Sequence, residues 1–185
     1  MKAWYATVLG MASVFEFPMA AWLTNDRANH RIALTAIPHL AEDPDKHNHA
    51  RLHHQAFEFA SFEDLNATYV RLRDEGIVPR ACLDHVMTFS YDYADPDFNY
   101  VELQSDNFGD REASKKWMHE STEFAQNPIG AFVDPDRVAR AFAEGTAFSE
   151  IRRRVWETDD FHPDELPDMG GPEPQPGDPP LPVKW

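Results

Sequence analysis

The sequence predicts an α+β fold built from two modules that repeat one order of elements. Residues 1–50 show a helix pattern followed by three strand patterns, and residues 51–108 show a strand, a helix and three further strands. The shared order indicates a duplicated βαβββ unit whose first copy lacks its opening strand. With 185 residues, the chain is long enough to bury a core without disulfide bonds.

The first module opens with apolar residues at helical spacing. Trp4, Tyr5, Val8 and Leu9 share this pattern, which Gly10 closes. Three apolar runs typical of strands follow, at residues 14–17, 20–23 and 30–37. The polar segment AEDPDKHNHARL then predicts a loop, and we interpret its histidines as solvated side chains.

The second module begins with the strand pattern HHQAFEFA at residues 53–60. The stretch SFED is typical of a capping box and predicts a helix that buries Leu65, Tyr69 and Leu72 and ends at Gly76. Three strands are expected after it, at residues 77–82, 85–93 and 100–104, the last two joined by the turn DPDFN.

The rest of the chain changes character twice. Residues 109–156 have helical patterning, with a helix expected over DREASKKWMHESTEF, a second capped by Asp134 with Pro135 at its first position, and a third over AFSEIRRRVW. We expect these helices to pack on the outside of the sheets. Residues 157–185 are rich in proline and acids, which predicts an extended, mostly disordered tail or, alternatively, a proline-rich ligand for a partner domain.

Charge and composition exclude several classes of function. Acidic residues outnumber basic ones by 32 to 17, for a formal charge of −15, so nucleic acid and anionic membrane surfaces are not expected partners. No apolar run reaches the length of a membrane span. The single cysteine, Cys82, gives no sign of a disulfide framework, which favours a cytoplasmic setting.

Strand alternation singles out one histidine and one glutamate. In HHQAFEF, His54 and Ala56 lie on the face opposite Phe57 and Phe59. In NYVELQ, Glu102 likewise lies on the face opposite the apolar Val101 and Leu103. Histidine and carboxylate ligands suit the facial arrangement that holds Fe(II), and zinc or manganese would accept them too. The alternative is a strand histidine with ordinary partners and a solvated surface acid.

The stretch HHQAFEFASFEDLNATYVRLRDEGIVPR, followed by DHVMTFSYDYADPDFNYVELQSDNF, resembles the vicinal oxygen chelate superfamily. Within that superfamily it is similar to the type I extradiol ring-cleavage dioxygenases. The resemblance rests on HHxAFE, on the DPDxN turn, and on a glutamate seven residues after the first aspartate of that turn, and with NPIGAFVDPD it covers roughly residues 1–145. It implies paired βαβββ modules whose sheets curl around a metal.

The resemblance also assigns roles to four residues. It implies that His54 and Glu102 bind the iron, with Mn(II) or Zn(II) less favoured. By the same resemblance His30, in NHRIAL, acts as acid and base on the diol, and His85, in DHVMTFS, lines the substrate pocket.

Three departures from the family pattern stand out. Phe98 replaces the glycine of the turn, and Asp92 replaces a pocket tyrosine, although Tyr91 and Tyr93 flank it and a strand bulge would bring one of them in. The family's first iron-binding histidine lies on a strand before the first helix, where this sequence begins. We expect a start codon placed too far downstream, rather than a natural loss or a compensating histidine.

Together these observations predict an extradiol-type dioxygenase that cleaves a catecholic ring with Fe(II) and O₂. The expected setting is aromatic hydrocarbon catabolism, in a homodimer or higher homo-oligomer formed through sheet edges. Two alternatives remain open at this point. One is a metal-free protein that binds a small aromatic ligand on the same fold, and the other is a metalloenzyme of glyoxalase or epimerase type.

Overall fold

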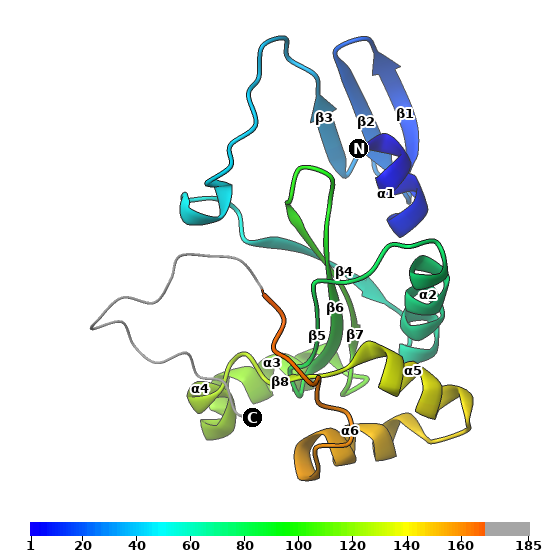
Figure 1. The fold of residues 1–185 in the computed structure, drawn as a ribbon, viewed down its shortest axis with the longest axis vertical. Helices are drawn as coiled ribbons and strands as arrows, with labels where there is room; N and C mark the ends of the chain where they lie inside the picture. Colours follow the sequence, from blue (N-terminus) through cyan, green and yellow to red (C-terminus); the bar gives the residue numbers. More distant parts are fainter. Residues whose placement is uncertain (169–185) are drawn as a thin grey trace. The chain divides into compact units, whose positions relative to one another are not determined.

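In a computed structural model of the chain, residues 1–168 are described, and they belong to two compact units (Figure 1). Met1–His53 and Ala94–Asn99 make up the first unit, and His54–Tyr93 with the segment from Tyr100 onward makes up the second. The mixed helices and sheets confirm the predicted α+β class. The predicted tail lies, from residue 169, outside the described residues.

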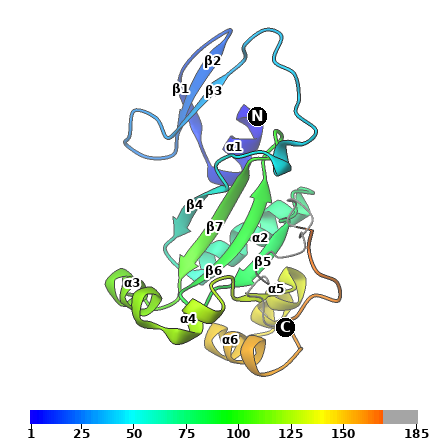
Figure 2. The ribbon, with the colours of Figure 1, turned by 90° about the vertical axis from the view of Figure 1, so that its left-hand side faces the viewer.

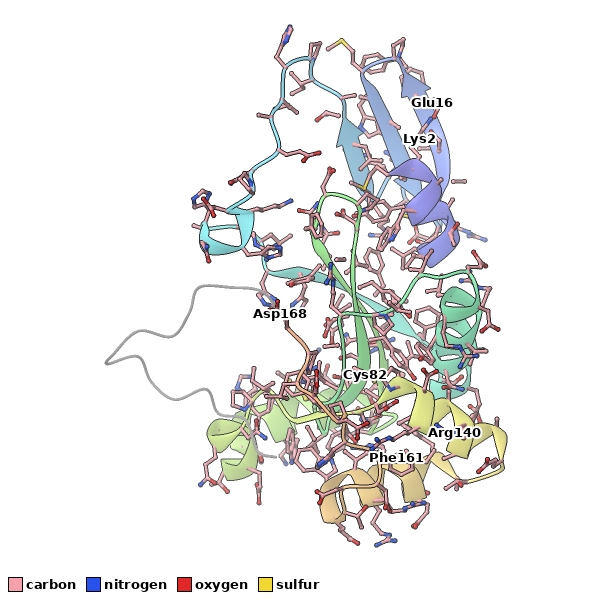
Figure 3. All side chains as sticks on the ribbon, viewed as in Figure 1. Lys2, Glu16, Cys82, Arg140, Phe161 and Asp168 are labelled. Carbon is pink, nitrogen blue, oxygen red and sulfur yellow. The ribbon has the colours of Figure 1, made fainter. Side chains whose placement is uncertain are left out.

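The first unit places a helix beside a three-stranded antiparallel sheet of order β1-β2-β3. Its elements are α1 (Lys2–Leu9), β1 (Ala12–Phe17), β2 (Ala20–Thr24), β3 (Ile32–Thr35) and the short η1 (Lys46–Asn48). As predicted, α1 ends at Gly10, which adopts a φ of 64°. Lys2 Nζ lies 2.7 Å from Glu16 Oε2 and so ties α1 to β1 (Figure 3).

A tight turn over residues 95–99 also belongs to the first unit. Asp95 Oδ1 accepts hydrogen bonds from the backbone N–H groups of Asp97 and Asn99, each at 2.9 Å. These bonds hold Phe98 at a φ of 60°, the region that favours glycine. The turn therefore has a positive φ at Phe98, a residue that tolerates this conformation poorly.

The second unit is built on a five-stranded sheet of order β4-β7-β6-β5-β8. Its strands are β4 (His54–Phe59), β5 (Ala81–Asp84), β6 (Thr88–Ala94), β7 (Tyr100–Asp106) and β8 (Ala131–Phe132). Strand β4 runs parallel to β7, whereas β5 is antiparallel to β6 and β8.

One face of this sheet is covered by α2 (Phe62–Asp74), seen behind the strands in Figure 2. Ser61 caps the helix by accepting the N–H of Asp64 at 3.1 Å, as the SFED pattern predicts. Leu65, Tyr69 and Leu72 are buried, which confirms the predicted face. The ring of Tyr69 stacks on Tyr91 of β6 with centroids 4.9 Å apart.

Two predicted strands begin later in the structure than the sequence pattern indicates. The strand expected over residues 77–82 forms at Ala81–Asp84, and the one expected over 85–93 forms only from Thr88. The late start of the second of these strands is caused by a turn after β5, in which Val86 has a φ of 71° that no strand accommodates.

The helices from residue 111 onward gather at one end of this sheet (Figure 1). They are α3 (Arg111–Glu120), α4 (Thr122–Gln126), α5 (Pro135–Ala143) and α6 (Phe148–Glu157). The single helix predicted over DREASKKWMHESTEF breaks at Ser121, whose hydroxyl caps α4. Strand β8 was not predicted, because two residues carry no periodicity. No helix among the described residues is long and apolar enough to cross a membrane.

The segment after α6 is anchored, unlike the disordered tail predicted from residue 157. Phe161 is 3% exposed and lies under the guanidinium of Arg154, 4.9 Å from the ring centroid (Figure 3). Its carbonyl accepts the N–H of Asp134 at 2.7 Å. Arg154 also pairs with Asp160, and Arg137 donates to the carbonyl of His162, so this buried aromatic ring and these polar contacts together hold the segment against the helices.

We expect Leu65→Ala to lower the free energy of unfolding by about 2–5 kcal/mol, because this fully buried side chain fills the space between α2 and the sheet. Arg71→Ala, on the exposed side of the same helix, should change it by about 0.5 kcal/mol or less. Urea unfolding of the two variants measures the difference. Equal effects would contradict the packing described.

Candidate metal centre

Three polar side chains of the second unit converge on the sheet face opposite α2. His54 Nε2, from β4, lies 3.3 Å from Glu102 Oε2 on β7. His85 Nε2, from the turn after β5, lies 3.7 Å from the other oxygen, Glu102 Oε1. Two imidazoles therefore face one carboxylate, and each imidazole approaches a different oxygen.

The burial of Glu102 is the most unusual feature of this cluster. Glu102 is 6% exposed, so the alternative of a solvated surface acid is wrong. The parallel pairing of β4 with β7 sets Ala56 beside Glu102, where a methyl group leaves room in front of the carboxylate. A buried carboxylate requires a partner that carries positive charge or donates a hydrogen bond, and an imidazolium or a metal cation supplies the positive charge.

His85 is oriented by contacts at both ring nitrogens. Nδ1 lies 2.5 Å from the carbonyl oxygen of Ile129, which only accepts, so Nδ1 carries a hydrogen and donates it. Nε2 lies 3.1 Å from Ser90 Oγ, and the neutral ring accepts the hydroxyl hydrogen there. The Nε2 lone pair of neutral His85 is thus held next to Glu102.

A close backbone approach makes the contact with Ile129 available. Gly130 has a φ of 93°, and a Cβ atom at this position would lie 2.2 Å from the carbonyl oxygen of Asp84 and 2.8 Å from Cα of His85. Only glycine fits there. The side chain of Asn127 fixes the loop by bonding both the N–H and the carbonyl of Gly130.

Asp92 lies on the same side of β6 as Ser90 and is 7% exposed. Burial, and then the negative charge of Glu102, raise the pKa of Asp92 to about 7. No slip or bulge between β5 and β6 brings a neighbouring tyrosine to the position of Asp92, because Asp92 aligns with Ala81 and Tyr91 with Cys82 in unbroken register. Tyr91 instead stacks on α2, so the position of the family tyrosine is held by a carboxyl group.

The remaining histidines behave differently. His30 precedes β3 in the first unit and is exposed, so the strand predicted over residues 30–37 does not include it. Its catalytic role stays a prediction. His49 Nδ1 lies 2.7 Å from Asp43, and His47 Nδ1 lies 2.7 Å from the guanidinium of Arg51, so these loop histidines have protein partners as well as solvent.

The donor atoms fit a divalent metal as a partial ligand set. Imidazole nitrogen and carboxylate oxygen are ligands that Fe(II), Mn(II) and Zn(II) share. Among residues 1–168, no group of three or more His, Cys, Asp or Glu side chains is arranged to hold a metal ion. His54 and Glu102 therefore stand as a pair of candidate ligands, with His85 engaged by Ser90 and Ile129.

Four contributors to this site escaped the sequence analysis. Ser90 was detectable, since it shares strand parity with Asp92. The Ile129 carbonyl and Gly130 lie in NPIGAF, a stretch that belongs to the family resemblance but carries no titratable group. Asp84 precedes His85 directly, yet nothing local indicates that its carboxylate is fully buried.

Comparison with known proteins shows the family of the chain. Residues 1–103 match the Glyoxalase/Bleomycin resistance protein/Dioxygenase superfamily, and the chain belongs to that superfamily. The chain is 40% identical over 156 residues to biphenyl-2,3-diol 1,2-dioxygenase 3 of Rhodococcus globerulus, a match that covers 84% of this chain and 82% of the relative. Biphenyl-2,3-diol 1,2-dioxygenase 2 of the same organism is 36% identical, with 84% and 81% covered.

A solved structure of a glyoxalase/bleomycin resistance protein/dioxygenase from Nocardioides is 23% identical, with a TM-score of 0.43 over 57% of this chain and 73% of that one. The family model and the two relatives confirm the resemblance that the sequence motifs indicate.

We expect Asp92→Asn to change how the stability of the metal-free protein depends on pH. Asp92 titrates near 7 when folded and near 4 when unfolded, so between these values the folded state binds the extra proton. The resulting stability is present below about pH 4 and is lost as the pH rises through 7, by up to about 1.4 kcal/mol per pH unit. Urea unfolding should show the wild type losing about 2–3 kcal/mol more than the variant between pH 5 and pH 8. If the unfolding free energies of the two proteins changed with pH in parallel, the raised pKa of the buried Asp92 would be contradicted.

Proposed function

We propose that this protein is an extradiol-type dioxygenase, which opens a catecholic ring at a bond beside the diol with Fe(II) and O₂. The observation that carries the proposal is the buried carboxylate of Glu102 facing the imidazoles of His54 and His85. Membership of the superfamily and homologues named biphenyl-2,3-diol 1,2-dioxygenase support it. A vicinal aromatic diol is accordingly the proposed substrate class.

In this proposal His54 and Glu102 are two of the metal ligands. When bound, Fe(II) supplies a Lewis-acidic centre with open positions for the two diol oxygens and for O₂. A buried carboxylate gains more from a nearby cation than an exposed one does, so Glu102 is a suitable anchor for the metal. The side chain of His54 is 42% exposed, so a metal ion can reach its Nε2 from solvent.

His85 is the proposed proton carrier. Its Nδ1 hydrogen is committed to the Ile129 carbonyl, so Nε2 is the atom that accepts a proton from the diol. The resulting imidazolium is stabilised by Glu102, 3.7 Å away, and by the Ser90 hydroxyl oxygen, which then accepts rather than donates. The same proton can be returned to the ring-opened product.

The proposal also assigns a cellular role. Ring opening of a diol is a step in the breakdown of aromatic compounds, and the single buried Cys82 suits the cytoplasm.

We expect anaerobic loading with Fe(II), followed by air and biphenyl-2,3-diol, to give a yellow ring-opened product with consumption of O₂. His54→Ala and Glu102→Gln should each lower iron affinity and ring opening by about 100-fold or more, because each removes a ligand. His119→Ala, at an exposed position of α3, is the matched control and should retain both. Iron content is measured by a chelator assay and O₂ uptake by an electrode.

Two outcomes would contradict the proposal. One is full iron content and ring opening in both ligand variants. The other is turnover that needs a different metal and consumes no O₂, which points to glyoxalase or epimerase chemistry.

A further inference from the structure

We propose that Arg152, on the C-terminal helix α6, is a positioning residue for His85. It holds the turn at Val86 in a conformation the turn would not adopt alone, and so keeps the His85 imidazole at Glu102. The inference rests on the proposed function, in which His85 carries the proton. It concerns a part of the chain beyond residues 1–103, to which the superfamily match extends.

The turn that Arg152 holds is strained. Val86 has a φ of 71°, in the left-handed region. A β-branched side chain is disfavoured there, because its Cβ substituents crowd the neighbouring carbonyl oxygens. Such a conformation persists only where the surrounding structure determines it, and it is found preferentially at functional sites.

The guanidinium of Arg152 supplies that restraint from two sides. Nη2 donates to the carbonyl of Val86 at 2.6 Å, and Nε donates to Asp84 Oδ2 at 3.0 Å. The other oxygen, Asp84 Oδ1, accepts the N–H of Val86 at 2.8 Å. Asn107 Nδ2 adds a second donor to the Val86 carbonyl at 3.1 Å. Both backbone polar groups of Val86 are therefore fixed.

His85 is the residue between the two that Arg152 holds. Its own N–H donates to the carbonyl of Thr88 at 2.9 Å, and the backbone of Gly130 blocks movement on the other side of its Cα. With Asp84 and Val86 fixed, the Cα–Cβ direction of His85 is fixed too. That direction brings Nδ1 to Ile129 and Nε2 to Ser90.

Helix α6 is itself a firm support for this contact. Ile151 and Val155 are buried on either side of Arg152 in the sequence. At the start of α6, Phe148 stacks on Phe62 of α2 with centroids 3.6 Å apart and ring planes 6° apart. Asp84 is fully buried, so its charge needs the guanidinium as a partner. The helix thus presents Arg152 from a fixed position.

The test uses the single variants Arg152→Gln and Arg152→Lys, and a double variant in which Arg152→Lys is combined with a compensating change at Val86. Lysine keeps the charge opposite Asp84 but cannot reach the Asp84 carboxylate and the Val86 carbonyl together, so this variant should fold even if the glutamine variant does not. In the Arg152→Lys variant, we expect the His85 ring nitrogen signals in NMR spectra of the metal-free full chain to shift and broaden relative to the wild type. In the iron-loaded enzyme we expect kcat to fall about tenfold, with little change in iron affinity or KM.

The decisive variant is Arg152→Lys combined with Val86→Gly. Glycine adopts a φ of 71° without strain, so the turn no longer depends on the hydrogen bonds from Arg152. Most of the wild-type kcat and the wild-type His85 signals should therefore be restored. Arg154→Lys, on the same helix and paired with Asp160, is the matched control and should change neither readout.

Three results would overturn the inference. They are unchanged His85 signals in Arg152→Lys, a double variant no better than the single one, and an equal loss in Arg154→Lys. If the wild-type protein opens no ring, the proposed function fails, but the NMR comparison still decides whether Arg152 positions His85.

Discussion

The site of the second unit depends on one carboxylate that the sheet removes from water. Glu102 lies on β7, between β4 and β6, and is 92% buried at its side chain. An ionised carboxylate in such a place is unfavourable unless positive charge or hydrogen-bond donors approach it. The imidazole of His54 on β4 meets this need when it donates a hydrogen, and that of His85 after β5 meets it when Nε2 is protonated. A divalent cation would meet it better.

The two faces of the sheet carry different kinds of side chain. The face toward α2 is filled by aromatic and aliphatic side chains, of which the stacked Tyr69 and Tyr91 are the centre. The opposite face collects the polar groups, with Ser90 and Asp92 from β6 beside Glu102. The turn that carries His85 is held by the segment after residue 109. The Ile129 carbonyl accepts a hydrogen bond from His85, and Arg152 donates to the carbonyl of Val86.

The sequence was sufficient where a side chain's direction follows from strand parity. Parity placed His54 and Glu102 on one face, and α2 on the other, because neighbouring strands share their pleat. It could not give the burial of Glu102 or the pKa of Asp92, which depend on packing between distant residues. It also extended a strand through Val86, because a β-branched residue normally favours strand. The clamp from Arg152, 66 residues away, overrides that preference.

The central claim is that His54 and Glu102 hold the catalytic metal. Anomalous X-ray diffraction at the iron edge, on crystals of the full chain loaded anaerobically with Fe(II), tests it most directly. We expect one strong peak about 2.0–2.2 Å from both His54 Nε2 and a carboxylate oxygen of Glu102, distances typical of such ligands. A fully loaded crystal whose iron lies away from both side chains would contradict it.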